Sequence, residues 1–110
     1  MMIAFIITGI WALGAIVGSA ELKFREMDIY PEREFWLGGV FVAPGARGNK
    51  IGSALAQKTA RIAYALRVKK LSLQTERQDG GLYSYLGWKA VEQVHHHGRD
   101  VLVMEKDLAS

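Results

Sequence analysis

Long apolar runs broken by glycine open the chain, which is the pattern of strands buried on both faces. Residues 3–13 and 15–24 are rich in Ile, Val, Phe and Trp, with a glycine between them. We therefore predict a hairpin that turns near Gly14. Residues 25–33 are polar and contain a proline, so they should form a loop. Residues 34–42 regain strand character, and the proline two positions later ends that strand.

From residue 49 the apolar period changes from that of a strand to that of a helix. Four apolar residues fall at spacings of four, seven and four: Ile51, Leu55, Ile62 and Leu66. These spacings place them on one face of a helix, which should pack against the sheet. Residues 71–75 alternate like a strand, so the helix should end near Val68.

The last third of the chain predicts a loop, a short helix and a second hairpin. Residues 76–81 are polar and end in two glycines, and residues 82–86 should form a helix that Gly87 stops. Residues 88–94 and 101–106 should pair through a six-residue connection. The predicted order of elements is therefore β-β-β-α-β-α-β-β.

Composition narrows the function classes. The chain has 110 residues, half of them apolar, so it should fold as one small domain. It has no cysteine, which excludes disulfides, thiolate metal sites and a cysteine nucleophile. A net charge of +3 suits an anionic ligand but is too small to indicate nucleic acid.

The apolar N-terminus allows two other interpretations, a secretory signal and a membrane span. No lysine or arginine occurs before Lys23, whereas a signal opens with basic residues. The run is also shorter than the roughly 20 apolar residues of a membrane span, and glycines interrupt it. We therefore expect strands here, no membrane contact and a cytoplasmic location.

Residues 40–53 carry the most informative pattern. A strand runs into a loop with glycines, and the loop runs into the helix. The first turn of a helix presents unpaired N–H groups and partial positive charge, and glycines let an anion come close. With Arg47 and Lys50 this makes a candidate cradle for a diphosphate. An ordinary strand-to-helix turn is the alternative. The spacing fits neither a Walker loop nor a dinucleotide fingerprint.

Two motifs resemble the GNAT (Gcn5-related) N-acetyltransferase superfamily. The family's coenzyme A loop follows a Val-x-Pro strand end and has the pattern Arg/Gln-x-x-Gly-x-Gly/Ala. Here Val42-Ala43-Pro44 precedes Arg47-Gly48-Asn49-Lys50-Ile51-Gly52, which matches except that Lys50 replaces the first glycine. The second motif, Leu82-Tyr83-Ser84-Tyr85-Leu86-Gly87-Trp88, resembles the family's Leu-Tyr-x-x-Leu-Gly-Phe/Trp.

The resemblance implies an α/β fold, a mixed, mostly antiparallel sheet with flanking helices. It implies a single domain over residues 1–110 in which the family's N-terminal helices have no counterpart. It also implies acetyl-CoA as cosubstrate, with backbone groups of Val40, Phe41 and Val42 holding the pantetheine arm. The pyrophosphate would lie on the loop and the first turn of the helix: Arg47, Gly48, Asn49, Lys50, Ile51, Gly52 and Ser53.

The family's general acid matches Tyr83, for which a packed aromatic is the alternative. Tyr85 lies on another helical face and should be structural. For the general base we predict Glu34, at the entrance of the central strand, acting through water. Glu21 and Glu76 are alternatives, and an exposed glutamate is usually only solvated.

The resemblance thus implies an acetyl-CoA-dependent N-acetyltransferase that acts on a primary amine of a small molecule or peptide. An acyl-CoA-binding module without turnover is the alternative function. We expect a homodimer, which would cover exposed sheet edges. Nucleic acid is not an expected partner. Three consecutive histidines begin at His95, but neighbouring residues of a hairpin point in alternating directions, so we predict turn residues and no metal.

Overall fold

The computed structural model describes residues 3–12, 15–48 and 50–108, so the turn predicted near Gly14 lies outside the described residues. The side chains of residues 3–8, 10–12, 15 and 16 also lie outside them. The elements follow one another in this order: β1 (Ile3–Ala12), β2 (Ala15–Phe24), β3 (Phe35–Val42), the 3-10 helix η1 (Pro44–Ala46), α1 (Ile51–Ala65), β4 (Lys70–Thr75), α2 (Leu82–Tyr85), β5 (Lys89–His96) and β6 (Arg99–Asp107). No helix within the described ranges has the length and apolar character to cross a membrane.

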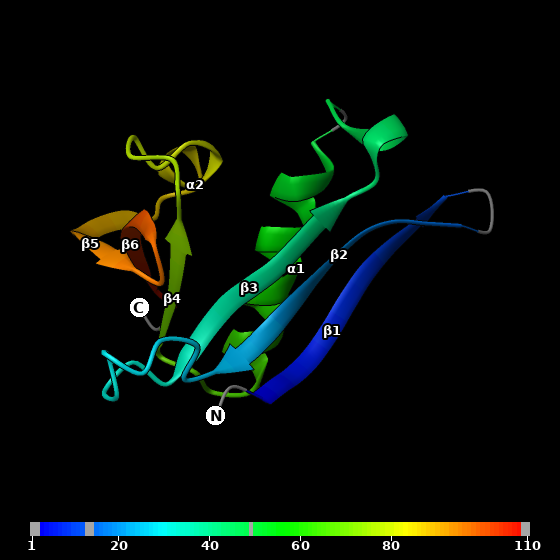
Figure 1. Cartoon of the computed structure of the whole chain (residues 1–110). Helices are drawn as coiled ribbons and strands as arrows, with labels where there is room; N and C mark the ends of the chain where they lie inside the picture. Colours follow the sequence, from blue (N-terminus) through cyan, green and yellow to red (C-terminus); the bar gives the residue numbers. More distant parts are fainter. Residues whose placement is uncertain (1–2, 13–14, 49, 109–110) are drawn as a thin grey trace.

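The six described strands join one sheet in the order β1-β2-β3-β4-β6-β5 (Figure 1). Four of the neighbouring pairs are antiparallel, and of the described strands only β3 and β4 run parallel. The crossover between these two parallel strands contains α1. The mixed, mostly antiparallel sheet with flanking helices that the sequence predicts is confirmed.

The two central strands, β3 and β4, meet at one point and then separate. Among the described residues their only pair is Trp36 and Ser72, near the start of each strand. Beyond this pair β3 carries a bulge, because its register against β2 shifts between Gly38 and Phe41, where Gly39 has a φ of +56°. A bulge bends a strand and increases its twist. Figure 1 shows the result: β3 and β4 diverge from their common end toward α1 and α2.

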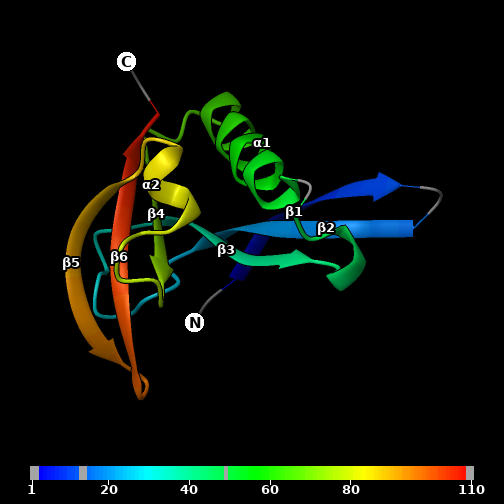
Figure 2. The same cartoon turned by 90° about the horizontal axis from the view of Figure 1, so that it is seen from above.

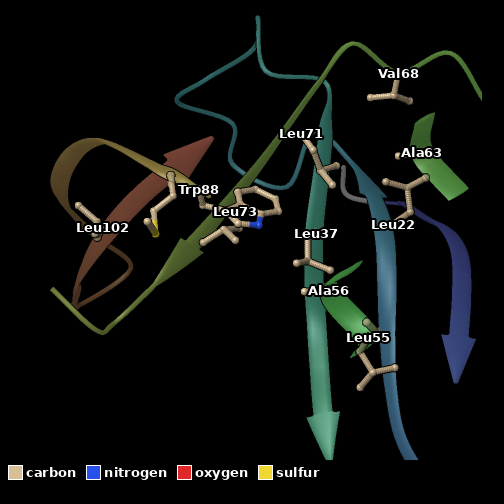
Figure 3. Packing of buried hydrophobic residues seen from close by; sticks show 12 residues of the cluster. Leu22, Leu37, Leu55, Ala56, Ala63, Val68, Leu71, Leu73, Trp88 and Leu102 are labelled. Carbon is tan, nitrogen blue, oxygen red and sulfur yellow. The ribbon is translucent and has the colours of Figure 1, made fainter. Parts of the chain in front are cut away.

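Apolar side chains pack on both faces of the sheet. The larger cluster joins β2, β3, β4 and β6 to residues of α1 and, at its border, to Tyr83 and Leu86 of the α2 region. Figure 2 shows α1 along this face, and Figure 3 shows Leu22 and Leu37 of the sheet beside Leu55, Ala56 and Ala63 of the helix. The smaller cluster lies on the opposite face under the loop after β2: Met27, Tyr30, Trp36, Val101 and Val103.

The buried face of α1 differs from the predicted one. Leu55 is buried as expected, but its companions are Ala56, Thr59 and Ala63, which continue at helical spacing. The prediction was wrong for Leu66, which is 53% exposed. Leu66 caps the helix, which ends at Ala65 rather than near Val68, and the next residue turns the chain away with a left-handed backbone. The small side chains let the helix axis lie close to the sheet.

Truncation of Leu55 should therefore cost far more stability than truncation of Leu66. Leu55 has no exposed surface, so Leu55→Ala should lower the free energy of unfolding by about 2–5 kcal/mol. The same change at Leu66 should stay within about 0.5 kcal/mol. Denaturant melts of both variants measure this difference, and equal losses would contradict the observed face of α1.

The second hairpin is longer and its turn tighter than predicted. β5 and β6 are paired as far as His96 and Arg99, which leaves a two-residue turn at His97 and Gly98 instead of a six-residue connection. Both turn residues have positive φ, +51° and +79°, which matches the right-handed twist of a two-residue hairpin. The prediction that all three histidines are turn residues was wrong, because His95 and His96 belong to β5. No group of three potential metal ligands occurs within the described part of the chain.

Candidate cofactor and active site

A tight loop connects β3 to α1 and sets the direction in which the helix begins. The N–H of Ala46 donates to the carbonyl of Ala43 at 2.8 Å, which closes the turn that η1 forms after Val42. Gly48 has φ +87° and Lys50 has φ +59° and ψ +25°, a left-handed backbone at the residue before the helix. This geometry favours glycine, so it accounts for the glycine of the family pattern at the position of Lys50.

The N-terminus of α1 is not capped by any side chain that the structure describes. The N–H of Ala54 donates to the carbonyl of Lys50 at 3.1 Å, and this is the first bond of the helix. The side chain of Lys50 makes no capping bond, and the first turn contains no acidic residue. The N–H groups of Ile51, Gly52 and Ser53 precede that first bond, and the helix dipole adds partial positive charge there. The turn is therefore suited to an anion.

A pocket of about 630 Å³ surrounds this turn. Its described lining contains two cations and no carboxylate: Val42, Arg47, Gly48, Lys50, Ile51, Gly52, Ser53, Leu82 and Tyr85. The predicted cradle residues thus line one pocket, except Asn49, which lies outside the described residues. A Cβ at Gly52 would lie 3.4 Å from Cδ2 of Leu82, so any longer side chain there must project into the pocket.

Packing between β2 and α1 also helps to place this turn. A Cβ at Gly18 of β2 would lie 2.7 Å from Cγ2 of Ile51 and 3.0 Å from Cδ1 of Leu55. Only a residue without a side chain lets the start of α1 approach the sheet this closely. A glycine inside an apolar strand was the available sequence signal for this contact.

The three predicted pantetheine contacts occupy the end of β3 that lies beside this pocket. Val40 and Val42 are partly buried against the larger apolar cluster, whereas Phe41 points away from it and is 51% exposed. Within the described residues no part of β3 beyond Trp36 pairs with β4. The backbone of this segment therefore has an edge that a ligand can pair with.

Tyr83 lies on α2, partly buried against the same cluster. Its ring meets that of Trp88 edge-on, with centroids 6.0 Å apart. Burial raises the pKa of the Tyr83 phenol above its usual value, because the charged form loses water. The phenol therefore stays protonated at neutral pH, which a proton donor requires.

Tyr85 differs from the sequence prediction. It is 91% exposed and lines the pocket at the start of α1, so the prediction of a structural packing role was wrong. Leu82, three residues earlier, lines the same pocket, and residues three apart share a helical face. The three-residue spacing of Leu82 and Tyr85 in the sequence therefore indicated that their side chains share one face of the helix.

The structure does not bring Glu34 to Tyr83. Glu34 precedes β3 at the end away from the cradle, where its carboxylate lies 3.9 Å from Arg25 and its side chain is 53% exposed. In Figure 1 this end of β3 is at the bottom and α2 is at the top. Of the alternatives, Glu76 pairs with Arg99 at 2.9 Å, and Glu21 pairs with Lys23 at 3.5 Å.

Comparisons with known proteins agree with this architecture. The profile of the family described as Acetyltransferase (GNAT) family matches residues 3–88. A search of curated proteins finds no match to the chain.

Several solved structures are similar over most of the chain. The ribosomal-protein-alanine N-acetyltransferase from Brucella melitensis is 25% identical, with a TM-score of 0.75 over 92% of this chain and 67% of that one. The N-acetyltransferase from Staphylococcus aureus Mu50 is 21% identical, with a TM-score of 0.75, 94% of this chain and 67% of that one covered. An aminoglycoside 6′-N-acetyltransferase complexed with coenzyme A is 16% identical, with a TM-score of 0.74, 94% of this chain and 73% of that one covered.

Proposed function

The chain belongs to the acetyltransferase (GNAT) family, and from this premise we propose that it transfers the acetyl group of acetyl-CoA to a primary amine. The observation that carries the proposal is the uncapped first turn of α1, which faces a pocket with two cations and no acidic residue in its described lining, beside the open edge of β3. The coenzyme A bound to the aminoglycoside 6′-N-acetyltransferase, which has the same fold, supports it.

In this proposal the pyrophosphate of acetyl-CoA lies on the N–H groups from Gly48 to Ser53. Arg47 and Lys50 are both exposed at the rim and add charge-assisted contacts to the phosphates. From there the pantetheine arm extends along β3 and pairs with the backbone of residues 40–42. A backbone N–H at the bulge can also stabilise the oxyanion that forms on the thioester carbonyl.

Tyr83 is the proposed proton donor. The amine nitrogen attacks the thioester carbon, the C–S bond breaks, and the thiolate takes the phenolic proton of Tyr83. The tyrosinate then regains a proton from water. Burial raises the pKa of the Tyr83 phenol, so the group is still protonated at neutral pH when the thiolate forms.

Glu34 stays a prediction as the proton acceptor from the amine. We also propose that the amine belongs to a small molecule or a peptide. Residues 1–110 would form a single catalytic domain, and the protein would be a cytoplasmic homodimer. A chain that binds acyl-CoA without turnover is the alternative that the experiment below separates.

The test is an acetyl-transfer assay with a panel of primary amines that includes diamines, amino acids and short peptides. We expect free thiol to be released from acetyl-CoA only when an accepted amine is present, with an acetylated product of matching mass. The same reaction without an amine is the control. Calorimetric binding of acetyl-CoA with no transfer to any amine would favour the binding module instead.

A further inference from the structure

A second pocket lies between the last turns of α1 and the end of β6, and no predicted function uses it. Its volume is about 580 Å³, and its described lining is Gln57, Ala60, Arg61, Tyr64, Lys106 and Leu108. Figure 2 shows the end of β6 beside the last turns of α1, and the N–H of Leu108 donates to the carbonyl of Lys69 at 2.8 Å. This bond fixes the end of β6 next to the chain that leaves the helix. We refer to the pocket as the α1–β6 groove.

The α1–β6 groove is separate from the cradle. Its described lining shares no residue with the pocket around the first turn of α1. Arg61 follows Ile51 by ten residues, which places it about 15 Å farther along the helix axis. The residues that α1 contributes follow one another at helical spacing and form one face. An occupant of the groove therefore contacts the second half of α1 and leaves the first turn free.

Two cations line the groove, and neither has a carboxylate partner among the described residues. Arg61 is exposed, and α1 contains no aspartate or glutamate that could reach it at helical spacing. Lys106 is partly buried, and its ammonium donates to the carbonyl of Leu86 at 2.7 Å. No ion pair in the described part of the chain includes either residue. Both positive charges are therefore available to an anion.

The carboxylates beside Lys106 belong to the other face of the sheet. Side chains alternate along a strand, so Glu105 and Asp107 point away from the groove. Glu105 lies 2.9 Å from Arg33 and 3.5 Å from Lys70, and Asp107 lies 3.8 Å from Lys70. Cations on that face already occupy both carboxylates. A partly buried cation without a counter-ion is unfavourable, so an external anion would stabilise the groove.

Apolar side chains lie beside the two cations, and they set the class of the ligand. Ala60 and Leu108 pack against the larger apolar cluster and also line the groove. A pocket that combines apolar surface with a few charged groups suits a small organic molecule rather than a bare inorganic ion. The guanidinium of Arg61 and the ammonium of Lys106 both form charge-assisted hydrogen bonds with a carboxylate. The groove therefore fits an anion that carries an apolar body.

We infer that the α1–β6 groove binds a small monocarboxylate with an apolar body. The carboxylate lies between Arg61 and Lys106, and the apolar body lies against Ala60 and Leu108. An ammonium has three N–H groups, so Lys106 can hold the carboxylate and keep its bond to Leu86. The site goes beyond the proposed function and does not depend on acetyl transfer, because its lining includes neither Tyr83 nor a residue of the cradle.

A titration with 3-phenylpropionate, followed in amide ¹⁵N–¹H spectra of the whole chain, tests this site. We expect saturable shifts at Ala60, Arg61, Lys106 and Leu108, and at Gly87, whose amide belongs to the same peptide group as the Leu86 carbonyl. The amides of the cradle should not shift. Two control compounds separate the parts of the ligand: 3-phenylpropanamide lacks the charge, and acetate lacks the apolar body. Each should bind at least about tenfold more weakly.

Arg61→Gln tests the charge of the groove, with Lys69→Gln as the matched control. Both variants lose one exposed positive charge, but Lys69 does not line the groove. Arg61→Gln should weaken 3-phenylpropionate binding at least about tenfold, and Lys69→Gln should stay within about twofold of wild type. Because Arg61 is exposed, its substitution should leave the chain folded. Lys106→Met keeps an apolar stem and should also weaken binding at least about tenfold.

Absence of a saturable shift, or equal affinity of wild type and folded Arg61→Gln, would overturn the assignment of this groove. Displacement of 3-phenylpropionate by saturating acetyl-CoA would overturn it as well, because the groove would then be part of the cofactor site. Absence of acetyl transfer by the wild-type chain would instead refute only the proposed function, since the titration involves no transfer.

Discussion

Gly52→Glu should abolish acetyl-CoA binding while the chain remains folded. Gly52 lines the pocket in the first turn of α1, and a Cβ added there would have Leu82 at 3.4 Å on one side. A glutamate must extend into the space proposed for the pyrophosphate, and its charge repels phosphate. A carboxylate in the first turn of a helix interacts favourably with the dipole, so stability should not fall through electrostatics. Binding affinity should drop at least about 1000-fold, beyond calorimetric detection.

Gln57→Glu is the control for that charge change. Gln57 is an exposed residue of the same helix and does not line the cradle. This variant should bind acetyl-CoA within about threefold of wild type, because Gln57 lies beyond the first turn of α1 and its exposed charge is screened by water and salt. Equal binding by Gly52→Glu and wild type would contradict the placement of the pyrophosphate.

Tyr83→Phe should lower kcat by about 10²–10⁴-fold with little change in acetyl-CoA affinity. The substitution keeps the ring that packs edge-on against Trp88 and removes only the hydroxyl. Burial raises the pKa of this phenol, so Tyr83 should stay protonated up to the pH at which an ordinary tyrosine titrates. Any loss of wild-type activity that its deprotonation causes should begin above that pH.

Tyr64→Phe is the matched control, since Tyr64 is 59% exposed on α1 and does not line the cradle. It should retain wild-type kcat. Thiol release and product formation in the steady state give kcat for both variants. A Tyr83→Phe protein with wild-type kcat would assign the aromatic a packing role only.

The sequence predicts the strand–loop–helix turn well because its determinants are local. A strand, a loop with glycines and an amphipathic helix follow one another within residues 36–66, and their contacts depend on neighbours along the chain. The positive φ of Lys50 and the exposure of Tyr85 were not predicted. The backbone of Lys50 belongs to the turn before α1, and the exposure of Tyr85 depends on which face of α2 packs on the sheet.

The contacts at the gap between β3 and β4 could not be predicted because their determinants are distant in the sequence. Glu26 and Gln74 are 48 residues apart, and they meet only because β3 and β4 share a single pair before they diverge. The sequence places Gly38 and Gly39 in a strand but does not say which side chains need their missing Cβ atoms. Glu34 was predicted from its position along one strand, and its carboxylate lies beside Arg25 at the end of β3 away from the cradle.

The most direct test of the acetyl-CoA site is a pair of amide ¹⁵N–¹H spectra of the labelled chain, with and without saturating acetyl-CoA. We expect the largest shifts at Gly48, Ile51, Gly52 and Ser53 and along residues 40–42, with the β5–β6 hairpin near His95 unchanged. Shifts confined to other elements, or no shifts at all in a folded chain, would contradict the account.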